Sequence, residues 1–207
     1  MTDPRTRLVG AGYDAMADTW ESWKAQITDD PRAEWCNELL VRLPETARVV
    51  ELGCGGGAPE TALLAERFRL TGVDLSEEQL RRARERIPGA EFVHADFSEI
   101  EFEPGSVDAV AAFYSFNHVP RDLLAPLYSR VRTWLVPGGL FLTTLGAGDS
   151  ESWIGEWLGT TMYFSSFPSD VNTRMLGEAG FELLRDELVT IREPEGDVTF
   201  QWILARR

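Results

Sequence analysis

From residue 48 onward, short apolar runs alternate with segments in which apolar residues recur at helical spacing. Such runs predict strands covered on both faces, and the segments between them predict helices. Strands that alternate with helices are typical of a parallel, doubly wound sheet. We expect strands at residues 48–52, 70–75, 91–94, 107–113 and 140–145, with helices at 58–68, 76–87 and 122–135.

The two ends of the chain carry a different pattern. Residues 182–191 and 198–205 are strand-like runs separated by a polar turn, which predicts an antiparallel pair. The amphipathic N-terminal segment predicts helices that cap the sheet. The predicted fold is therefore α/β: a Rossmann-like, doubly wound, mostly parallel seven-stranded sheet with N-terminal cap helices and a C-terminal antiparallel hairpin. Linkers and repeats are absent from the sequence, so residues 1–207 are predicted to form a single domain.

The helix expected after residue 75 carries two further signals. Ser76 and Gln79 have the spacing of a capping box, in which the serine caps the first turn and the glutamine reaches back. A run of arginines with interspersed acids follows, and it predicts a solvated helix face more than a nucleic-acid patch. These basic residues are Arg81, Arg82, Arg84 and Arg86.

Composition narrows the partners that the chain can have. The 207 residues are 43% hydrophobic, as in a globular protein, and carry a formal charge of −14. A nucleic-acid backbone or an anionic membrane needs a basic face, so neither is an expected partner. The sequence lacks an apolar stretch of the roughly 20 residues that a membrane span requires.

Leader segments and metal clusters are also not indicated. Residues 1–7 lack the apolar core of a signal peptide, which makes the cytoplasm the expected location. Cys36 and Cys54 cannot build a framework of disulfides, and His94 and His118 do not complete a cluster at zinc spacing. We predict no metal.

The most informative segment is the glycine-rich turn that follows the first predicted strand. Gly53, Gly55 and Gly57 let the backbone turn sharply and approach a ligand closely. Glu51 precedes them, and Asp74 closes the next strand, where an acid can accept hydrogen bonds from two ribose hydroxyls. A glycine-rich turn on its own would indicate only a structural turn without a ligand. The strand before it, the helix after it and Asp74 together favour a nucleoside site.

These residues resemble a known family. Glu51-x-Gly53-x-Gly55-x-Gly57 followed by Gly72-Val73-Asp74-Leu75-Ser76 is similar to the class I S-adenosylmethionine-dependent methyltransferases, in particular those that act on small molecules. Residues 94–97, 107–110 and 135–140 match further segments of that family. The specific match covers about residues 47–142 and concerns the cofactor more than the molecule that receives the methyl group.

The resemblance implies a role for each matching residue. Gly53 and Gly55 would line the methionine portion of the cofactor, Glu51 would lie near its ammonium group, and Asp74 would bind its ribose. Asp96 would face the exocyclic amine and Phe97 the adenine ring, while Tyr13 would close over the cofactor. The full set of cofactor-binding residues expected from the resemblance is Tyr13, Glu51, Gly53, Gly55, Asp74, Leu75, Asp96, Phe97 and Tyr114.

One physical argument supports S-adenosylmethionine over a dinucleotide. The pyrophosphate of a dinucleotide suits a helix N-terminus without nearby acids, and Glu51 would repel it. S-adenosylmethionine carries a sulfonium and an ammonium, which an acid tolerates. A nicotinamide-dependent dehydrogenase is therefore disfavoured.

The segment after the fourth predicted strand bears on the chemistry. His118 titrates near neutrality and is the candidate base, with a wall of the cofactor pocket as the alternative role. The Asn/Asp-Pro-Pro-aromatic signature of relatives that methylate base or glutamine nitrogens is absent from residues 113–120. We expect a metal-independent transfer, to oxygen more than to nitrogen or carbon.

Aromatic residues between 153 and 167 suggest where the methyl-accepting molecule binds. Trp153 and Trp157 are four residues apart, which predicts one helical face. Such residues can be core, or can form a lid over an apolar or aromatic molecule. By this reasoning residues 1–46 are the cap helices, 47–142 the cofactor-binding core, 143–180 the lid and 181–207 the closing hairpin. The predicted substrate-binding residues are Trp20, Trp153, Trp157, Tyr163 and Phe164.

The sequence thus predicts a methyltransferase that acts on a small, aromatic or apolar molecule, as a monomer or a homodimer. The alternative is a protein of this fold that binds S-adenosylmethionine for a non-methylating or regulatory purpose, because fold and cofactor do not fix chemistry.

Overall fold

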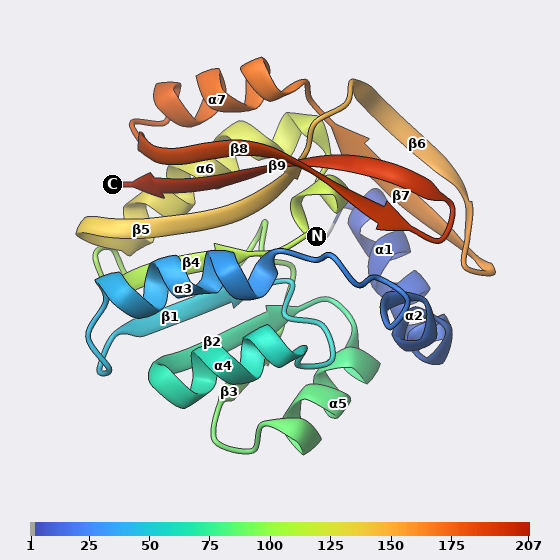
Figure 1. The fold of residues 1–207 in the computed structure, drawn as a ribbon, viewed down its shortest axis with the longest axis horizontal. Helices are drawn as coiled ribbons and strands as arrows, with labels where there is room; N and C mark the ends of the chain where they lie inside the picture. Colours follow the sequence, from blue (N-terminus) through green and yellow to red (C-terminus); the bar gives the residue numbers. More distant parts are fainter. Residues whose placement is uncertain (1–2) are drawn as a thin grey trace.

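The computed structural model describes residues 3–207, and its centre is a seven-stranded sheet (Figure 1). Neighbouring strands run parallel from β3 through β5, whereas β9 is antiparallel to both β5 and β8. This confirms the predicted fold class, including the C-terminal hairpin. In spatial order the strands are β3 (Glu91–His94), β2 (Arg69–Asp74), β1 (Arg48–Leu52), β4 (Val107–Ala112), β5 (Leu135–Gly146), β9 (Gly196–Arg206) and β8 (Glu182–Glu193).

Helices cover both faces of the sheet. Successive strand residues point to opposite sides, so alternate residues of each strand pack against different helices. Val49, Ala109 and Leu142 pack with α3 and α4, whereas Val50 and Val110 pack with α6 and α7. The strands are therefore apolar on both faces, as a parallel sheet requires. The helices are α1 (Pro4–Ala15), α2 (Ala17–Lys24), α3 (Arg32–Arg42), α4 (Pro59–Arg67), α5 (Glu77–Arg86), α6 (Arg121–Trp134) and α7 (Ser169–Glu178), with a short 3₁₀ turn at Phe116–His118.

The segment predicted to be helical around the two tryptophans is instead a second, two-stranded sheet, so that prediction was wrong. Strand β6 (Ser150–Trp157) pairs antiparallel with β7 (Thr160–Ser166). A spacing of four is even, so it also places Trp153 and Trp157 on one side of a strand. Leu158 and Gly159 both have positive φ, which is the backbone of a tight two-residue hairpin turn. The turn and the β-preferring aromatics outweigh the helical spacing.

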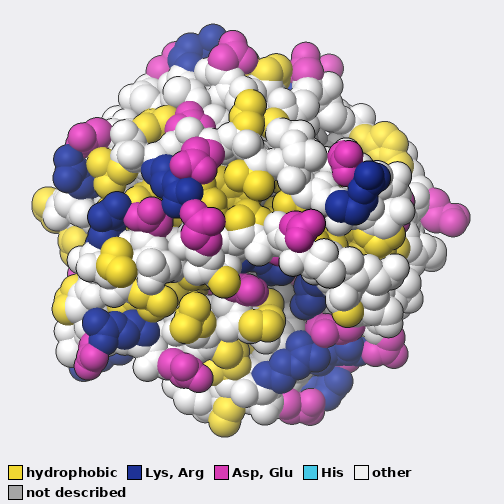
Figure 2. Space-filling model, viewed as in Figure 1, with side chains coloured by type: hydrophobic (Ala, Val, Ile, Leu, Met, Phe, Trp, Pro, Cys, Tyr) yellow, Lys and Arg dark blue, Asp and Glu magenta, His cyan; other side chains and the backbone are white. Residues whose placement is uncertain are grey.

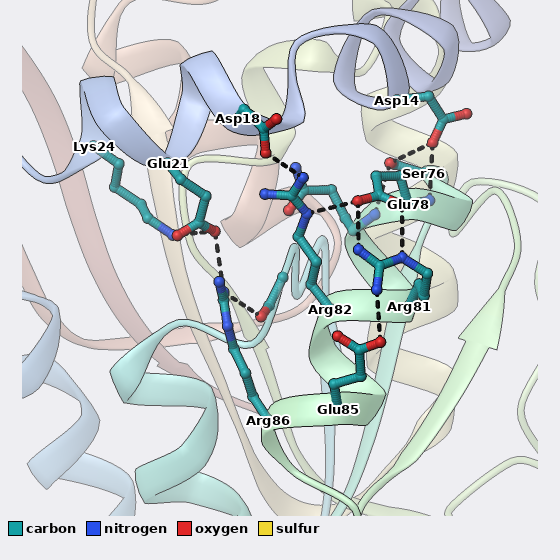
Figure 3. Close-up of polar contacts among 12 residues, drawn as sticks. Asp14, Asp18, Glu21, Lys24, Ser76, Glu78, Arg81, Arg82, Glu85 and Arg86 are labelled. Atoms are coloured by element: carbon teal, nitrogen blue, oxygen red, sulfur yellow. Dashed lines mark hydrogen bonds and ion pairs between the residues drawn. The ribbon is translucent and has the colours of Figure 1, made fainter.

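Helix α1 packs against β7 and α5, and polar contacts join both cap helices to α5 along its length (Figure 3). Asp14 accepts hydrogen bonds from the Ser76 hydroxyl (2.6 Å) and from the Glu78 backbone N–H (3.1 Å). Asp18 pairs with Arg82 at 2.6 Å, and Glu21 pairs with Arg86 at 3.0 Å. The basic run on α5 is thus only partly a solvated face, because two of its arginines bind acids of the cap.

None of the helices formed by residues 3–207 combines the length and the apolar character needed to cross a membrane. On the face shown in Figure 2, acidic and basic side chains are interspersed and do not gather into a basic stripe.

Candidate functional site

A cavity of about 850 Å³ lies where the carboxyl ends of β1, β2 and β4 meet the cap helices, the β6–β7 pair and the tip of the β8–β9 hairpin. This is the crevice in which doubly wound sheets bind their ligands. Most of the residues singled out from the sequence line it: Tyr13, Trp20, Glu51, Gly53, Gly55, Asp74, Leu75, Asp96, Phe97, Tyr114, His118, Trp153, Trp157 and Phe164.

The glycine-rich turn is formed by a backbone that other residues cannot adopt without strain. Gly53 has a φ of 78°, and a Cβ added to it would lie 2.4 Å from the Cβ of Ser115. Its N–H donates to the carbonyl of Val73 at 2.7 Å, which ties the turn to β2. The turn is therefore fixed before any ligand arrives.

Asp74 is oriented by the same turn. One carboxylate oxygen accepts from the Gly55 N–H at 2.8 Å, and the other accepts from the Ser76 N–H at 2.9 Å. Burial is the largest influence and raises the pKa of Asp74, although the backbone donors oppose it. The side chain lines the cavity, so its remaining lone pairs are available to hydroxyl donors.

Glu51 is a buried carboxyl group, and one of its oxygens has no hydrogen-bond partner within residues 3–207. Its side chain is 3% exposed, and Oε1 accepts from the Thr61 hydroxyl at 3.2 Å. Oε2 has no hydrogen-bond partner in the described part of the chain. Burial raises the pKa of Glu51 to about 8. A cationic group entering beside it would favour the ionised form, so Glu51 suits an ammonium.

Asp96 repeats this pattern at the end of β3. Oδ1 accepts from the Ser98 N–H at 2.8 Å, whereas the buried Oδ2 has no partner among residues 3–207. The neighbouring Phe97 stacks on Phe116, with ring centroids 5.7 Å apart. The pair offers an amine-binding oxygen beside an aromatic wall, which fits an adenine.

Gln79 is a site residue that the sequence did not reveal. Its side chain is 1% exposed and lines the cavity, and neither amide atom has a partner within the described residues. The Ser76 hydroxyl does accept from the Gln79 N–H at 3.1 Å, so half of the predicted capping box is confirmed. The reciprocal half is wrong because Asp74 already accepts from the Ser76 N–H. The Gln79 amide is therefore free to bind a ligand.

His118 is held by two hydrogen bonds that fix its tautomer. Nδ1 lies 2.9 Å from the carbonyl of Tyr163, which can only accept, so Nδ1 carries the proton. Nε2 then carries no proton and accepts a hydrogen bond from the Tyr13 hydroxyl at 2.9 Å. Burial lowers the pKa of His118 to about 4. The ring is neutral at neutral pH, and its basic nitrogen is occupied by Tyr13.

The predicted substrate residues divide between the cavity and the core. Trp20, Trp153, Trp157 and Phe164 line the cavity. The side chain of Tyr163 does not, and its prediction as a substrate contact was wrong. It is fully buried under α1, because β-strand alternation turns it away from its neighbour Phe164. It contributes through its carbonyl, which orients His118.

Tyr114 lines the cavity in an uncommon backbone conformation, with a φ of 54°. Its hydroxyl donates to Asp30 at 3.1 Å, and its ring packs edge-on against Phe200 and Trp202. No group of three or more His, Cys, Asp or Glu side chains from Asp3 onward is arranged to hold a metal ion.

Part of the chain is similar to known methyltransferases. Residues 49–139 match the family described as a methyltransferase domain. A trans-aconitate 2-methyltransferase of Paracidovorax citrulli (strain AAC00-1) is 43% identical over 119 residues, which are 54% of this chain and 44% of that protein. A 27-O-demethylrifamycin SV methyltransferase of Amycolatopsis mediterranei (strain S699) is 30% identical over 142 residues, 58% of this chain and 52% of that protein. The chain spans about half the length of these relatives.

Among solved structures, a similar fold is found in 1,6-didemethyltoxoflavin-N1-methyltransferase of Burkholderia thailandensis, crystallised with 1,6-didemethyltoxoflavin and S-adenosylhomocysteine. The TM-score is 0.76, and the match covers 100% of this chain and 91% of that chain at 19% identity. Identity this low shows a shared fold and no more.

Proposed function

We propose that this chain is a class I S-adenosylmethionine-dependent methyltransferase that transfers a methyl group from S-adenosylmethionine to a small organic substrate, and the match of residues 49–139 to a methyltransferase domain supports the proposal. The observation that carries the proposal is the set of carboxyl groups around the glycine turn. Glu51 and Asp96 each keep a buried oxygen without a partner among residues 3–207, and Asp74 faces the same cavity. Three such groups suit the ammonium, amine and ribose hydroxyls of one cofactor.

When bound, S-adenosylmethionine supplies an electrophilic methyl group on its sulfonium. The chain's own residues then have to bind the cofactor and orient the substrate. Glu51 would hold the ammonium, Asp74 the ribose and Asp96 the adenine amine, with Gln79 as an additional donor and acceptor. Transfer is an in-line displacement, so holding the substrate atom against the methyl group in a site cleared of water accounts for much of the rate.

We assign His118 a positioning role in place of the catalytic role predicted from the sequence. Its bare nitrogen is engaged by Tyr13, and its pKa of about 4 leaves it a weak base. The Tyr13 ring contacts both Trp20 and His118 edge-on, so the histidine holds this tyrosine at the wall of the cavity.

The substrate we propose is small and aromatic or apolar, methylated without a metal and at oxygen more than at nitrogen or carbon. Trp20, Trp157 and Phe164 give the outer part of the cavity an aromatic wall. The name of one relative, 27-O-demethylrifamycin SV methyltransferase, also points to oxygen. The cytoplasmic location and the monomeric or homodimeric state stay predictions from the sequence.

Isothermal titration calorimetry tests the proposal. S-adenosylmethionine and S-adenosylhomocysteine should bind, whereas NAD should not, because the cavity-lining cations Lys24 and Arg32 are already paired with Glu21 and Asp30 and do not offer a pyrophosphate a free positive charge. Absence of binding of both at millimolar concentration would contradict the proposed function. Binding without any methylated product across a broad panel of phenols and alcohols would favour a non-methylating role.

A further inference from the structure

The charged groups that line the cavity are strongly unbalanced. Two are cations, Lys24 and Arg32, and both are engaged. Lys24 lies 3.5 Å from Glu21 and over the ring of Trp20, while Arg32 pairs with Asp30 at 2.8 Å. Six carboxyl groups line the same space: Asp30, Glu51, Asp74, Asp96, Glu193 and Asp197. An anionic substrate would meet no unpaired cation among these lining residues.

Most of the six carboxyl groups have an assigned partner. Glu51, Asp74 and Asp96 are at the cofactor end, and Asp30 is bound by Arg32 and by the Tyr114 hydroxyl. Asp197 pairs with Arg192 at 2.9 Å. This leaves one carboxyl group at the hairpin end of the cavity, that of Glu193.

Glu193 closes β8 and makes no side-chain hydrogen bond or ion pair within the described residues. The nearby Glu195 is held instead, since both of its oxygens lie 2.9 Å from the indole nitrogen of Trp23. Burial raises the pKa of Tyr13 on α1 and of Tyr114 after β4, and the charge of Glu193 adds a small part to both shifts. The three side chains line the same cavity.

The tryptophans that line the same cavity as Glu193 favour a cation in a second way. Trp20 and Trp23 stack with centroids 5.2 Å apart, and Trp157 lies against both. Indole faces attract cations and exclude water from a neighbouring carboxylate. Burial and the charge of Glu195 raise the pKa of Glu193 to about 7, as expected for a carboxyl group that lacks a partner.

We propose that Glu193 is a specificity-determining residue that binds the substrate, and that the substrate is an aromatic amine or alcohol, neutral or cationic, and not a carboxylate. The inference rests on the proposed function, since it assigns the cofactor end of the cavity to S-adenosylmethionine. It separates this chain from a methyltransferase whose substrate is an anion such as trans-aconitate, despite the sequence similarity to enzymes of that name. The carboxylate binds the amine or hydroxyl group and holds the ring against the tryptophans that line the cavity.

The test is a charge series on one ring: benzylamine, benzyl alcohol and benzoate, titrated by NMR into protein saturated with S-adenosylhomocysteine. We expect benzylamine to bind at least about tenfold more tightly than benzoate, with benzyl alcohol between them. Glu193→Gln keeps the shape and removes the charge, so it should reduce the benzylamine preference by about tenfold. Glu187→Gln is the matched control on the same strand, since Glu187 is exposed and pairs with Arg185.

Three results overturn the inference: benzoate binding as tightly as benzylamine, no benzylamine binding at millimolar concentration, or an unchanged preference in Glu193→Gln. The thermal midpoint of each variant without ligands checks folding. It should rise in Glu193→Gln, because an unpartnered carboxylate is removed, and a fall would show a structural partner. Failure of S-adenosylhomocysteine to bind wild-type protein contradicts the proposed function instead, and the series is then measured without it.

Discussion

The two ends of the cavity are built by different means. At the turn end, sequence separations are shorter: Asp74 is held by the backbone N–H groups of Gly55, 19 positions away, and of Ser76, 2 positions away. At the hairpin end, contacts join residues that are distant in the chain: Trp23 donates to Glu195, 172 positions away. The turn end is therefore a local structure that a ligand completes, and the hairpin end is assembled by the tertiary fold. Changes at the first should affect cofactor binding, and changes at the second should affect substrate choice.

The largest effect should come from Asp74→Ala. Two hydrogen bonds from ribose hydroxyls to a carboxylate are lost, each worth about 1.5–3 kcal/mol, so affinity for S-adenosylhomocysteine should fall by roughly a hundredfold or more. Asp197→Ala, at the hairpin end, should bind it as wild type does. Calorimetry on both variants makes the comparison, and equal losses would show that the two ends are not separable.

Gly53→Ala should be the next most severe change. The positive φ and the contact of the new Cβ with Ser115 should cost about 1–3 kcal/mol of unfolding free energy. Gly177→Ala is the control: it lies in α7 with open space around it, and alanine there should stabilise by about 0.5–1 kcal/mol. Urea denaturation should therefore show a lower free energy of unfolding for Gly53→Ala and a higher one for Gly177→Ala, and a Gly53→Ala variant as stable as wild type would refute the assignment of strain to the turn.

The pKa of Glu51 predicts a pH dependence of cofactor binding. Without ligand the group holds its proton up to about pH 8, whereas the complex requires the carboxylate, so binding releases a proton. Affinity for S-adenosylhomocysteine should then rise about tenfold between pH 6 and 7, since one pH unit is 1.36 kcal/mol for one released proton. It should level off above about pH 8, where the Glu51 carboxyl group of the free protein is itself ionised and binding no longer releases a proton.

Calorimetry in buffers of different ionisation enthalpy counts the released proton directly. Glu51→Gln should abolish the slope, whereas Glu193→Gln at the other end should leave it in place. A slope that survives Glu51→Gln would assign the proton to another group.

The smallest effect belongs to the hydrogen bond between Tyr13 and His118. A double-mutant cycle with Tyr13→Phe and His118→Phe should give a coupling of about 0.5–1.5 kcal/mol in unfolding free energy. Because His118 is neutral above a pKa of about 4, the wild-type rate should show no inflection near the ordinary pKa of histidine. An inflection near 6.5 that disappears in His118→Gln would restore the histidine as the base.

The same division explains what the sequence could predict. The strands, the glycine turn and Asp74 follow from local patterns, and the structure places them together at one edge of the sheet. Trp157 shows the opposite case, because a spacing of four fits a helix and a strand equally and only the turn at Leu158 and Gly159 decides. Gln79 was assigned to a capping box because the sequence cannot show that Asp74 already occupies the Ser76 N–H.

Glu193 is the residue that sequence reasoning had least means to find. It stands in a polar turn among other acids, and such a run is ordinarily solvated. Glu193 lacks a partner because the neighbouring groups are paired with others: Trp23 donates a hydrogen bond to Glu195, and Arg192 forms an ion pair with Asp197. Pairing of this kind is a property of the folded chain.

The bond between Trp23 and Glu195 also sets the order in which the cavity can be completed during synthesis. A growing chain can form the glycine turn and β4 well before residue 195 leaves the ribosome, and the cap helices are made earlier still. The cap helices must therefore wait for the β8–β9 hairpin. We expect a nascent chain that ends before β8 to hold the nucleoside-binding turn with one side of the cavity still open.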